Sequence, residues 1–169
     1  KGRTHGITLK VGHLQPASRG NVRLIGPHHD RKVMINANFL EAPEDLQHQV
    51  RSLRAGLAFL EMPALSSIID EVFSPPQARQ LLEAGVAGSQ EALEGFIRQY
   101  CKTTYHPVGT CRMGPDAERS VVDLDLRVHG IEGLRVIDCS VFPRLPRGNT
   151  NAPTIAVAEK AADLLIAAQ

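Results

Sequence analysis

Tryptophan is absent from this sequence, and aromatic residues make up only 4% of its 169 residues. So few aromatic side chains cannot form a platform for stacking bases, and a net charge of +1 gives no attraction toward a polyanion. No apolar run approaches the length of about 18 residues that a membrane-spanning helix needs. We therefore expect no nucleic-acid partner and no transmembrane segment.

Cysteine is equally scarce, and Cys101, Cys111 and Cys139 form no Cys-x-x-Cys pair. Zinc and dithiol redox sites use closely spaced cysteines, so we expect three free thiols. Free thiols favour a reducing compartment, and we expect a cytoplasmic protein, either free or peripheral to the inner membrane. The adjacent His28 and His29 lie in a polar turn where neighbouring side chains diverge. We therefore expect no metal site.

Hydrophobic residues form 43% of the chain, which is enough for a core of ordinary size, and their spacing predicts an α+β fold. Alternating apolar positions predict strands that pair as an antiparallel meander over residues 5–14, 21–25 and 33–35. Beyond residue 114 the pattern predicts short strands over residues 121–122, 126–128 and 134–137. The expected architecture is an antiparallel or mixed sheet packed with helices, followed by a strand–helix tail.

Apolar residues at spacings of three and four predict helices over residues 43–60, 64–73, 89–100 and 151–167. Ser89 is a suitable N-cap for the third helix, and Pro153 suits the first turn of the last. In the last helix we expect the core-facing residues to be Ile155, Ala158, Ala162 and Leu165.

The most distinctive stretch surrounds His106, between a predicted helix and a pair of glycines. Pro107 fixes its own φ and biases the residue before it toward extended geometry, while Gly109 and Gly114 permit tight bends. A histidine held on such a loop suits acid/base chemistry. A lone histidine here also fits a structural role, as a helix cap or as a ring packed in a turn.

A second polar position, Asn151, begins the last predicted helix. The first N–H groups of a helix have no intrahelical partner, and the helix dipole favours negative charge near them. Asn151 also fits a plain N-cap, so both interpretations stay open. A hydrolase triad of Ser140, His106 and Asp138 is less consistent with the sequence, because the serine and aspartate are two residues apart and no Gly-x-Ser-x-Gly motif is present.

Six short motifs occur in one order along the chain. They are Pro16-x-Ser18-Arg19-Gly20, Tyr105-His106-Pro107-Val108-Gly109-Thr110-Cys111-Arg112-Met113-Gly114, Val121-Val122-Asp123, Val128-His129-Gly130, Leu134-Arg135-Val136-Ile137-Asp138-Cys139-Ser140 and Asn149-Thr150-Asn151-Ala152-Pro153-Thr154. Together they resemble the C-terminal part of the glucose-methanol-choline (GMC) oxidoreductases over nearly the whole chain. The resemblance is strongest to the bacterial choline dehydrogenase and alcohol dehydrogenase branch.

This resemblance implies FAD-dependent oxidation of a small primary alcohol, choline-like or other, to an aldehyde with hydride transfer to flavin N5. It implies that His106 is the catalytic base and that Asn151 holds the substrate oxygen. It further implies four cofactor-binding residues, with Asp138 and Cys139 near the ribityl chain of the flavin and Ala152 and Pro153 beside its isoalloxazine ring.

The Rossmann-type Gly-x-Gly-x-x-Gly loop of the family does not occur in these 169 residues. The resemblance therefore implies that the N-terminal FAD-binding part of a longer protein is a partner of this chain. Residues 1–120 would form the substrate-binding region, and residues 121–169 the tail that completes the FAD domain. We expect the chain alone to bind no FAD and to be inactive. The alternative is a non-catalytic binding module in which His106 and Asn151 are unused.

Overall fold

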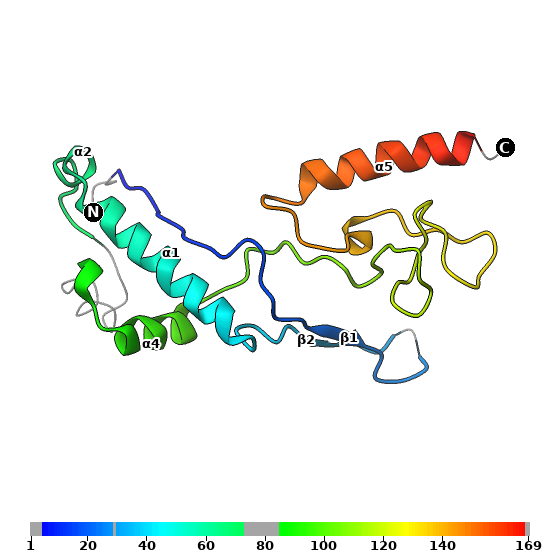
Figure 1. Ribbon diagram of the computed structural model, residues 1–169, viewed down its shortest axis with the longest axis horizontal. Coiled ribbons are helices and arrows are strands. Elements are labelled where there is room, and N and C mark those ends of the chain that lie inside the picture. The colour runs from blue at the N-terminus through cyan, green and yellow to red at the C-terminus, as the bar shows by residue number, and fades with distance from the viewer. Residues whose placement is uncertain (1–4, 29, 73–84, 168–169) are drawn as a thin grey trace. The chain divides into compact units, whose positions relative to one another are not determined.

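The computed structural model describes residues 5–28, 30–72 and 85–167, and the chain divides into two compact units. The first unit comprises residues 1–19 and 38–102, and the second comprises residues 20–37 and 103–169. Figure 1 labels the helices and strands of both units along the chain. Two expectations, the divergent side chain of His29 and a helix end at Phe73, lie outside the described residues.

Two helices form the core of the first unit. The helix α1 spans Pro43–Glu61 and α4 spans Gln90–Tyr100, as the apolar spacing predicts, and they lie side by side in Figure 1. The hydroxyl of Ser89 accepts the N–H of Ala92 at 3.2 Å, which confirms Ser89 as the N-cap of α4. The buried residues shared by the two helices are Leu46, Val50, Leu57, Leu93 and Ile97.

The helix predicted over residues 64–73 is too long. The helix α2 spans only Pro63–Ser66, because the N–H groups of Ile68 and Ile69 then bond to carbonyls three residues back rather than four. Such bonds tighten the chain into a turn and do not continue an α-helix. A further short 3₁₀ turn, η2, spans Gly85–Ala87.

The strand predicted over residues 5–14 does not form, since this segment has no regular structure. A strand is stabilised by a hydrogen-bonded neighbour, and here the alternating side chains contact a helix instead. Leu9 and Val11 lie over Gly56 of α1, where an added Cβ would be 2.7 Å from Val11 Cγ1 and 3.6 Å from Leu9 Cδ2. The alternation of apolar residues in this segment therefore reflects contact with α1 and not pairing in a sheet.

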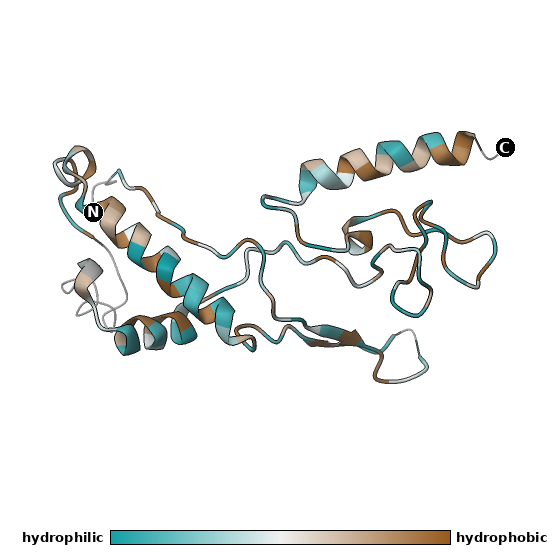
Figure 2. Ribbon diagram, viewed as in Figure 1, coloured by the Kyte–Doolittle hydropathy of each residue, from teal (hydrophilic) through white to brown (hydrophobic). Residues whose placement is uncertain are grey.

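The two-stranded sheet belongs to the second unit. Strands β1 (Asn21–Arg23) and β2 (Met34–Asn36) pair antiparallel with Val22 opposite Ile35, which confirms the pairing predicted for these two segments. Both strands are three residues long, and Figure 2 shows apolar residues along them. Val22 and Ile35 are 49% and 70% exposed, so this hairpin is not covered within the described structure.

The short strands predicted beyond residue 114 form single bridges. Val122 pairs with Val128 and Arg127 with Arg135, both antiparallel. Between them, Asp123 Oδ1 accepts two N–H groups of the following turn, both at 2.8 Å. An aspartate that bonds its own backbone in this way bends the chain, so the paired segments stay too short for a ladder.

The last helix, α5, spans Asn151–Ile166 as predicted, but a different side of it is buried. Ile155 and Leu165 are 54% and 42% exposed, whereas Val157 and Ala161 pack on the core. Figure 2 shows apolar bands along the length of α5, and a helix with apolar residues on more than one side gives no unique buried face. The other buried members of this core are Val122, Leu126, Val141 and Phe142. Among the described helices, none combines the length and apolar character needed to cross a membrane.

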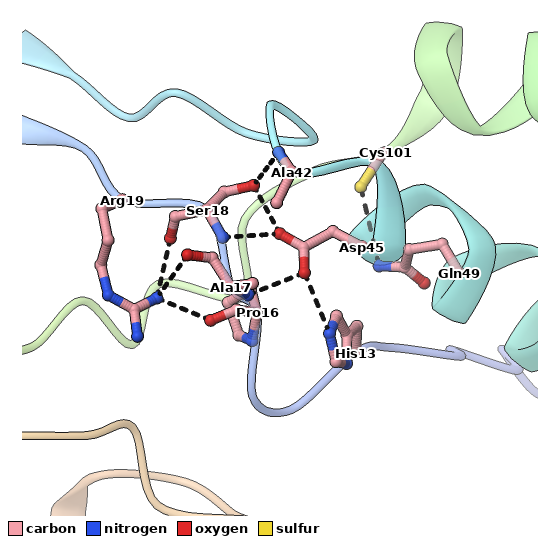
Figure 3. Close-up of polar contacts among 9 residues, drawn as sticks. All are labelled: His13, Pro16, Ala17, Ser18, Arg19, Ala42, Asp45, Gln49 and Cys101. Carbon is pink, nitrogen blue, oxygen red and sulfur yellow. Dashed lines mark hydrogen bonds and ion pairs between the residues drawn. The ribbon is translucent and has the colours of Figure 1, made fainter.

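A buried carboxylate joins the start of the chain to α1 (Figure 3). Asp45 is 2% exposed and accepts the N–H groups of Ala17 at 2.7 Å and Ser18 at 2.9 Å, together with the Ser18 hydroxyl at 2.5 Å. The Nε2 atom of His13 lies 3.2 Å from Asp45 Oδ1. Ser18 Oγ in turn accepts the N–H of Ala42, just before the helix, at 3.0 Å. We call these residues the Asp45 cluster.

The Asp45 cluster stabilises the charged form of its carboxylate. Burial raises the pKa of Asp45, but the Ser18 hydroxyl, the two backbone N–H groups and the nearby His13 outweigh burial and hold the pKa below its ordinary value. The carboxylate therefore remains ionised at neutral pH and fixes the turn at residues 16–19 against the N-terminus of α1.

Candidate functional site

The histidine loop, residues 105–114, is held in the second unit by its main chain. The N–H of Cys111 donates to the carbonyl oxygen of Ser140 at 3.0 Å, and the N–H of Met113 donates to that of Val141 at 2.7 Å. Both acceptors belong to the 3₁₀ turn η3, which spans Cys139–Val141. The loop is therefore positioned by backbone hydrogen bonds to a turn that is distant in the sequence.

The tight bend predicted at Gly109 is present. Its φ is 86°, and an added Cβ would lie 3.3 Å from the carbonyl oxygen of Phe142. Tyr105 also has a positive φ of 63°, which is unusual for a bulky residue, and its N–H donates to Thr103 Oγ1 at 3.0 Å. His106 therefore lies in a short segment with a left-handed residue at each end, Tyr105 and Gly109.

His106 is half-buried and is directed to the N-terminus of α5. Its Nδ1 lies 3.0 Å from Oγ1 of Thr150, a residue that is only 9% exposed and immediately precedes Asn151. The ring contacts Thr150 rather than the end of α4 at Tyr100, so it is not a cap of that helix. The structure therefore brings the two candidate catalytic positions to one place.

The first turn of α5 offers donors to a ligand. Its N-cap position is Thr150, so Asn151 is the first helical residue and not the cap. Asn151 and Ala152 are exposed, and Pro153 is half-buried and has no N–H. The main-chain N–H groups of the first two residues have no partner within the helix. Together with the helix dipole, they favour an anionic oxygen or a ring that accumulates negative charge.

Asp138 serves a local role in η3. Its side chain is exposed, and Oδ1 accepts the N–H of Ser140 at 2.7 Å, which caps the turn. The strand that we predicted to end at Asp138 is not formed as a strand. Because the Asp138 carboxylate bonds the Ser140 backbone and the His106 ring bonds Thr150, these contacts do not form a Ser–His–Asp relay.

Cys139 links η3 to the histidine loop, since its Sγ lies 3.5 Å from the carbonyl oxygen of Pro107, the neighbour of His106. All three cysteines are free thiols, as expected, and burial raises the pKa of Cys101. Within the described ranges, no group of three or more His, Cys, Asp or Glu side chains could hold a metal ion. The predicted site residues of the second unit thus share one framework, formed by the loop, η3 and the start of α5.

Thr150 is not among the site residues predicted from the sequence. Its position directly before Asn151 was visible, but a threonine next to a helix start is common and its partner lies 44 residues away. A hollow of the same unit, lined in part by Arg127, Ile131, Leu134 and Leu165, includes none of the six predicted site residues. The candidate site therefore rests on the contact between His106 and Thr150 and not on this hollow.

Comparison with known proteins identifies similar sequences. A family model described as GMC oxidoreductase matches residues 16–158. The chain is 36% identical over 162 residues to an alcohol dehydrogenase [acceptor] of Pseudomonas putida, covering 96% of this chain and 28% of that protein. It is 37% identical over 159 residues to an oxygen-dependent choline dehydrogenase of Chromohalobacter salexigens, covering 94% and 27%. The chain therefore spans little more than a quarter of the length of these relatives.

Solved structures give a consistent result. The chain is similar to pyridoxine 4-oxidase from Mesorbium loti, with a TM-score of 0.76 and 30% identity over 89% of this chain and 28% of that one. It is similar to a fungal aryl-alcohol oxidase with a TM-score of 0.76 and 34% identity, covering 90% of this chain and 24% of the oxidase. The helices and the small two-stranded sheet thus correspond to a fragment of the fold that these two oxidases share.

Proposed function

Because the chain belongs to the GMC oxidoreductase family, we propose that it forms the C-terminal catalytic portion of an FAD-dependent enzyme that oxidises a small primary alcohol, choline-like or other, to an aldehyde. The observation that supports this most is the hydrogen bond between His106 and Thr150, because Thr150 directly precedes Asn151 at the start of α5. The names of the alcohol and choline dehydrogenases among the relatives support the same reaction class.

In this proposal His106 is the general base. A neutral alcohol is a poor hydride donor and an alkoxide a good one, so the hydroxyl proton has to be removed as hydride leaves the carbon. With Nδ1 engaged by Thr150, the nitrogen that takes the proton is Nε2. For that transfer Nε2 has to come within roughly 2.6–3.2 Å of the substrate hydroxyl.

Asn151 holds the substrate oxygen. An amide has no basic nitrogen but donates two N–H groups, which stabilise negative charge on that oxygen as the proton leaves. Its place in the first turn of α5 adds the positive end of the helix dipole to the same region. In this proposal His106 removes the proton and Asn151 stabilises the charge that results.

The residues present are compatible with one end of a flavin. When bound, FAD supplies the hydride acceptor of the reaction. The first turn of α5, where Ala152 is exposed and Pro153 is half-buried, would face the isoalloxazine ring, and Asp138 and Cys139 would lie beside the ribityl chain. The N–H groups of the α5 N-terminus suit the part of the ring where negative charge collects on reduction.

The remainder of the cofactor requires another region of protein. We propose that this region is an N-terminal FAD-binding part, which the relatives have room for because only 27–28% of their length is matched. Residues 1–120 of the chain would contribute to substrate binding and residues 121–169 would complete the FAD domain.

Rapid mixing of alcohol with the flavin-loaded full-length protein, which includes the N-terminal FAD-binding part, tests the proposal in the absence of oxygen. We expect His106→Ala to slow flavin reduction by about 10² to 10⁴ while flavin content is unchanged, which is the usual loss for a general base. The matched histidine control is His28→Ala, at an exposed position in the turn between β1 and β2. In this variant the flavin should be reduced at the normal rate. Normal flavin reduction in His106→Ala would remove His106 from the mechanism.

A further inference from the structure

We propose that Thr150 is a positioning residue that selects the tautomer and orientation of His106. This inference rests on the proposed function, in which His106 is the base. The Nδ1 of His106 and the Oγ1 of Thr150 are 3.0 Å apart, within hydrogen-bond distance, and the threonine is only 9% exposed. A hydroxyl can accept from Nδ1–H or donate to a bare Nδ1, and only the first arrangement leaves a lone pair on Nε2, as the proposed function requires.

The tautomer matters because a neutral imidazole has one nitrogen that donates and one that accepts. When Nδ1–H donates to Thr150 Oγ1, the lone pair is on Nε2, and Nε2 can take a proton from an alcohol. The opposite tautomer would present an N–H to the substrate and could not act as a base. Once Nε2 is protonated, Nδ1–H still donates to the same oxygen, now as a stronger, charge-assisted bond.

Thr150 is itself fixed in place. Its carbonyl oxygen accepts the N–H of Thr154 at 3.0 Å and the hydroxyl of Thr154 at 2.6 Å, which binds the residue to the first turn of α5. A β-branched side chain also has few allowed χ1 rotamers. The backbone of Thr150 is therefore tied to α5, and because Asn151 is the next residue, a bond to Thr150 Oγ1 holds the His106 ring near the start of α5.

Three substitutions in the flavin-loaded full-length protein separate the effect of the Thr150 hydroxyl from the effect of packing around it. Thr150→Val keeps the shape and removes the hydroxyl, whereas Thr150→Ser keeps the hydroxyl and removes a methyl group. Thr104→Val makes the same chemical change at an exposed position two residues before His106 and is the matched control. Ring ¹⁵N shifts of labelled histidine report the tautomer, and the His106→Ala variant identifies which signals belong to His106.

We expect the wild type, Thr150→Ser and Thr104→Val to show His106 as the Nδ1–H tautomer. Thr150→Val should show a mixture of tautomers and a kcat about tenfold lower, the effect of one neutral hydrogen bond, with little change in KM or flavin content. If Thr150→Val acted only through loss of packing, the tautomer would not change. Thr150→Ser, which also loses packing, would then be impaired even though it keeps the hydroxyl.

The inference is overturned if Thr150→Val retains the wild-type tautomer and kcat, or if Thr150→Ser loses both. The proposed function fails separately, if His106→Ala reduces flavin at the normal rate. In that case a changed tautomer in Thr150→Val would still show that Thr150 orients the ring, although not for catalysis.

Discussion

The N–H of Met113 donates to the carbonyl oxygen of Val141 at 2.7 Å, across an interval of the sequence that contains the whole region of single bridges. With the neighbouring bond from Cys111 to Ser140, it holds the histidine loop against η3. The orientation of His106 therefore depends on how closely the loop approaches this turn, and Gly109 is the residue that permits the approach.

We expect Gly109→Ala to lower the free energy of unfolding by about 1–2 kcal/mol, because an L-residue is strained at a φ of 86°. Gly130→Ala is a matched control, since Gly130 has a φ of 75° but nothing within 4 Å of an added Cβ. Both variants carry the backbone strain, but only Gly109→Ala brings a Cβ to within 3.3 Å of the Phe142 carbonyl.

Hydrogen exchange of the Cys111 and Met113 amides distinguishes the two variants, because these amides report the bonds between the loop and η3. We expect faster exchange in Gly109→Ala and wild-type exchange in Gly130→Ala. Equal exchange in both variants would mean that the close approach at Gly109 does not position the loop.

For Asn151→Ala we expect a fall in kcat/KM of about 10- to 100-fold, the effect of removing a hydrogen bond to a charged group. The loss should be smaller than that of His106→Ala, because the base would remain. Asn149→Ala, which changes an exposed asparagine just before the helix, should have wild-type kinetics. If Asn151→Ala lost as much activity as His106→Ala, the proposed division of roles would be wrong.

The chain purified alone should be colourless. It includes the proposed flavin-facing residues, but its 169 residues contain no Gly-x-Gly-x-x-Gly loop to hold the pyrophosphate of FAD. Gel filtration with added FAD, followed by visible absorbance, measures this directly, and we expect flavin to elute apart from protein. Tightly bound flavin would show that the 169 residues form a sufficient site.

Asp45 should make the chain sensitive to acid. Because its pKa in the folded chain lies below the ordinary value of about 4, the stabilisation is complete above that value and is lost as the pH falls through the folded pKa. Asp45→Asn should lower the free energy of unfolding at neutral pH by about 1–3 kcal/mol, because a buried and fully bonded carboxylate is removed. Urea unfolding followed by circular dichroism, at neutral and acid pH, measures both effects.

The matched control is Glu44→Gln, which removes an exposed carboxylate from the same first turn of α1. This variant tests the effect of a charge near the helix dipole without changing the Asp45 cluster. In that cluster His13 faces the carboxylate, and its ring stacks on that of His48 with the ring centroids 4.5 Å apart. We expect Glu44→Gln to change stability by less than about 1 kcal/mol. If Asp45→Asn lost as little, or kept the wild-type dependence on pH, the cluster would not be the source of acid sensitivity.

The helices could be predicted from the sequence because their signals are local. Pro43 and Ser89 mark the starts of α1 and α4, and apolar spacing gives their extents. The pairing of β1 with β2 was also predicted, but the strand expected over residues 5–14 was wrong, because the alternation of Leu9 and Val11 arises from contact with α1. The buried side of α5 was also ambiguous, since apolar residues occur on several sides of that helix.

The candidate site shows the same division between local and distant information. Pro107 and Gly109 predicted the bend, and the structure contains it. The contact between His106 and Thr150 joins residues 44 positions apart, and such a pair leaves no periodic signal in one sequence. The roles assigned to His106 and Asn151 remain predictions that the kinetic experiments test.

Anchoring through main-chain atoms leaves the side chains of the anchor free to vary. At Cys111 and Ser140 the bond that joins the loop to η3 uses only N–H and C=O groups, and both side chains are half-buried rather than buried. Directed evolution that randomises these two positions should therefore change their side chains while the bond that joins the loop to η3 is kept.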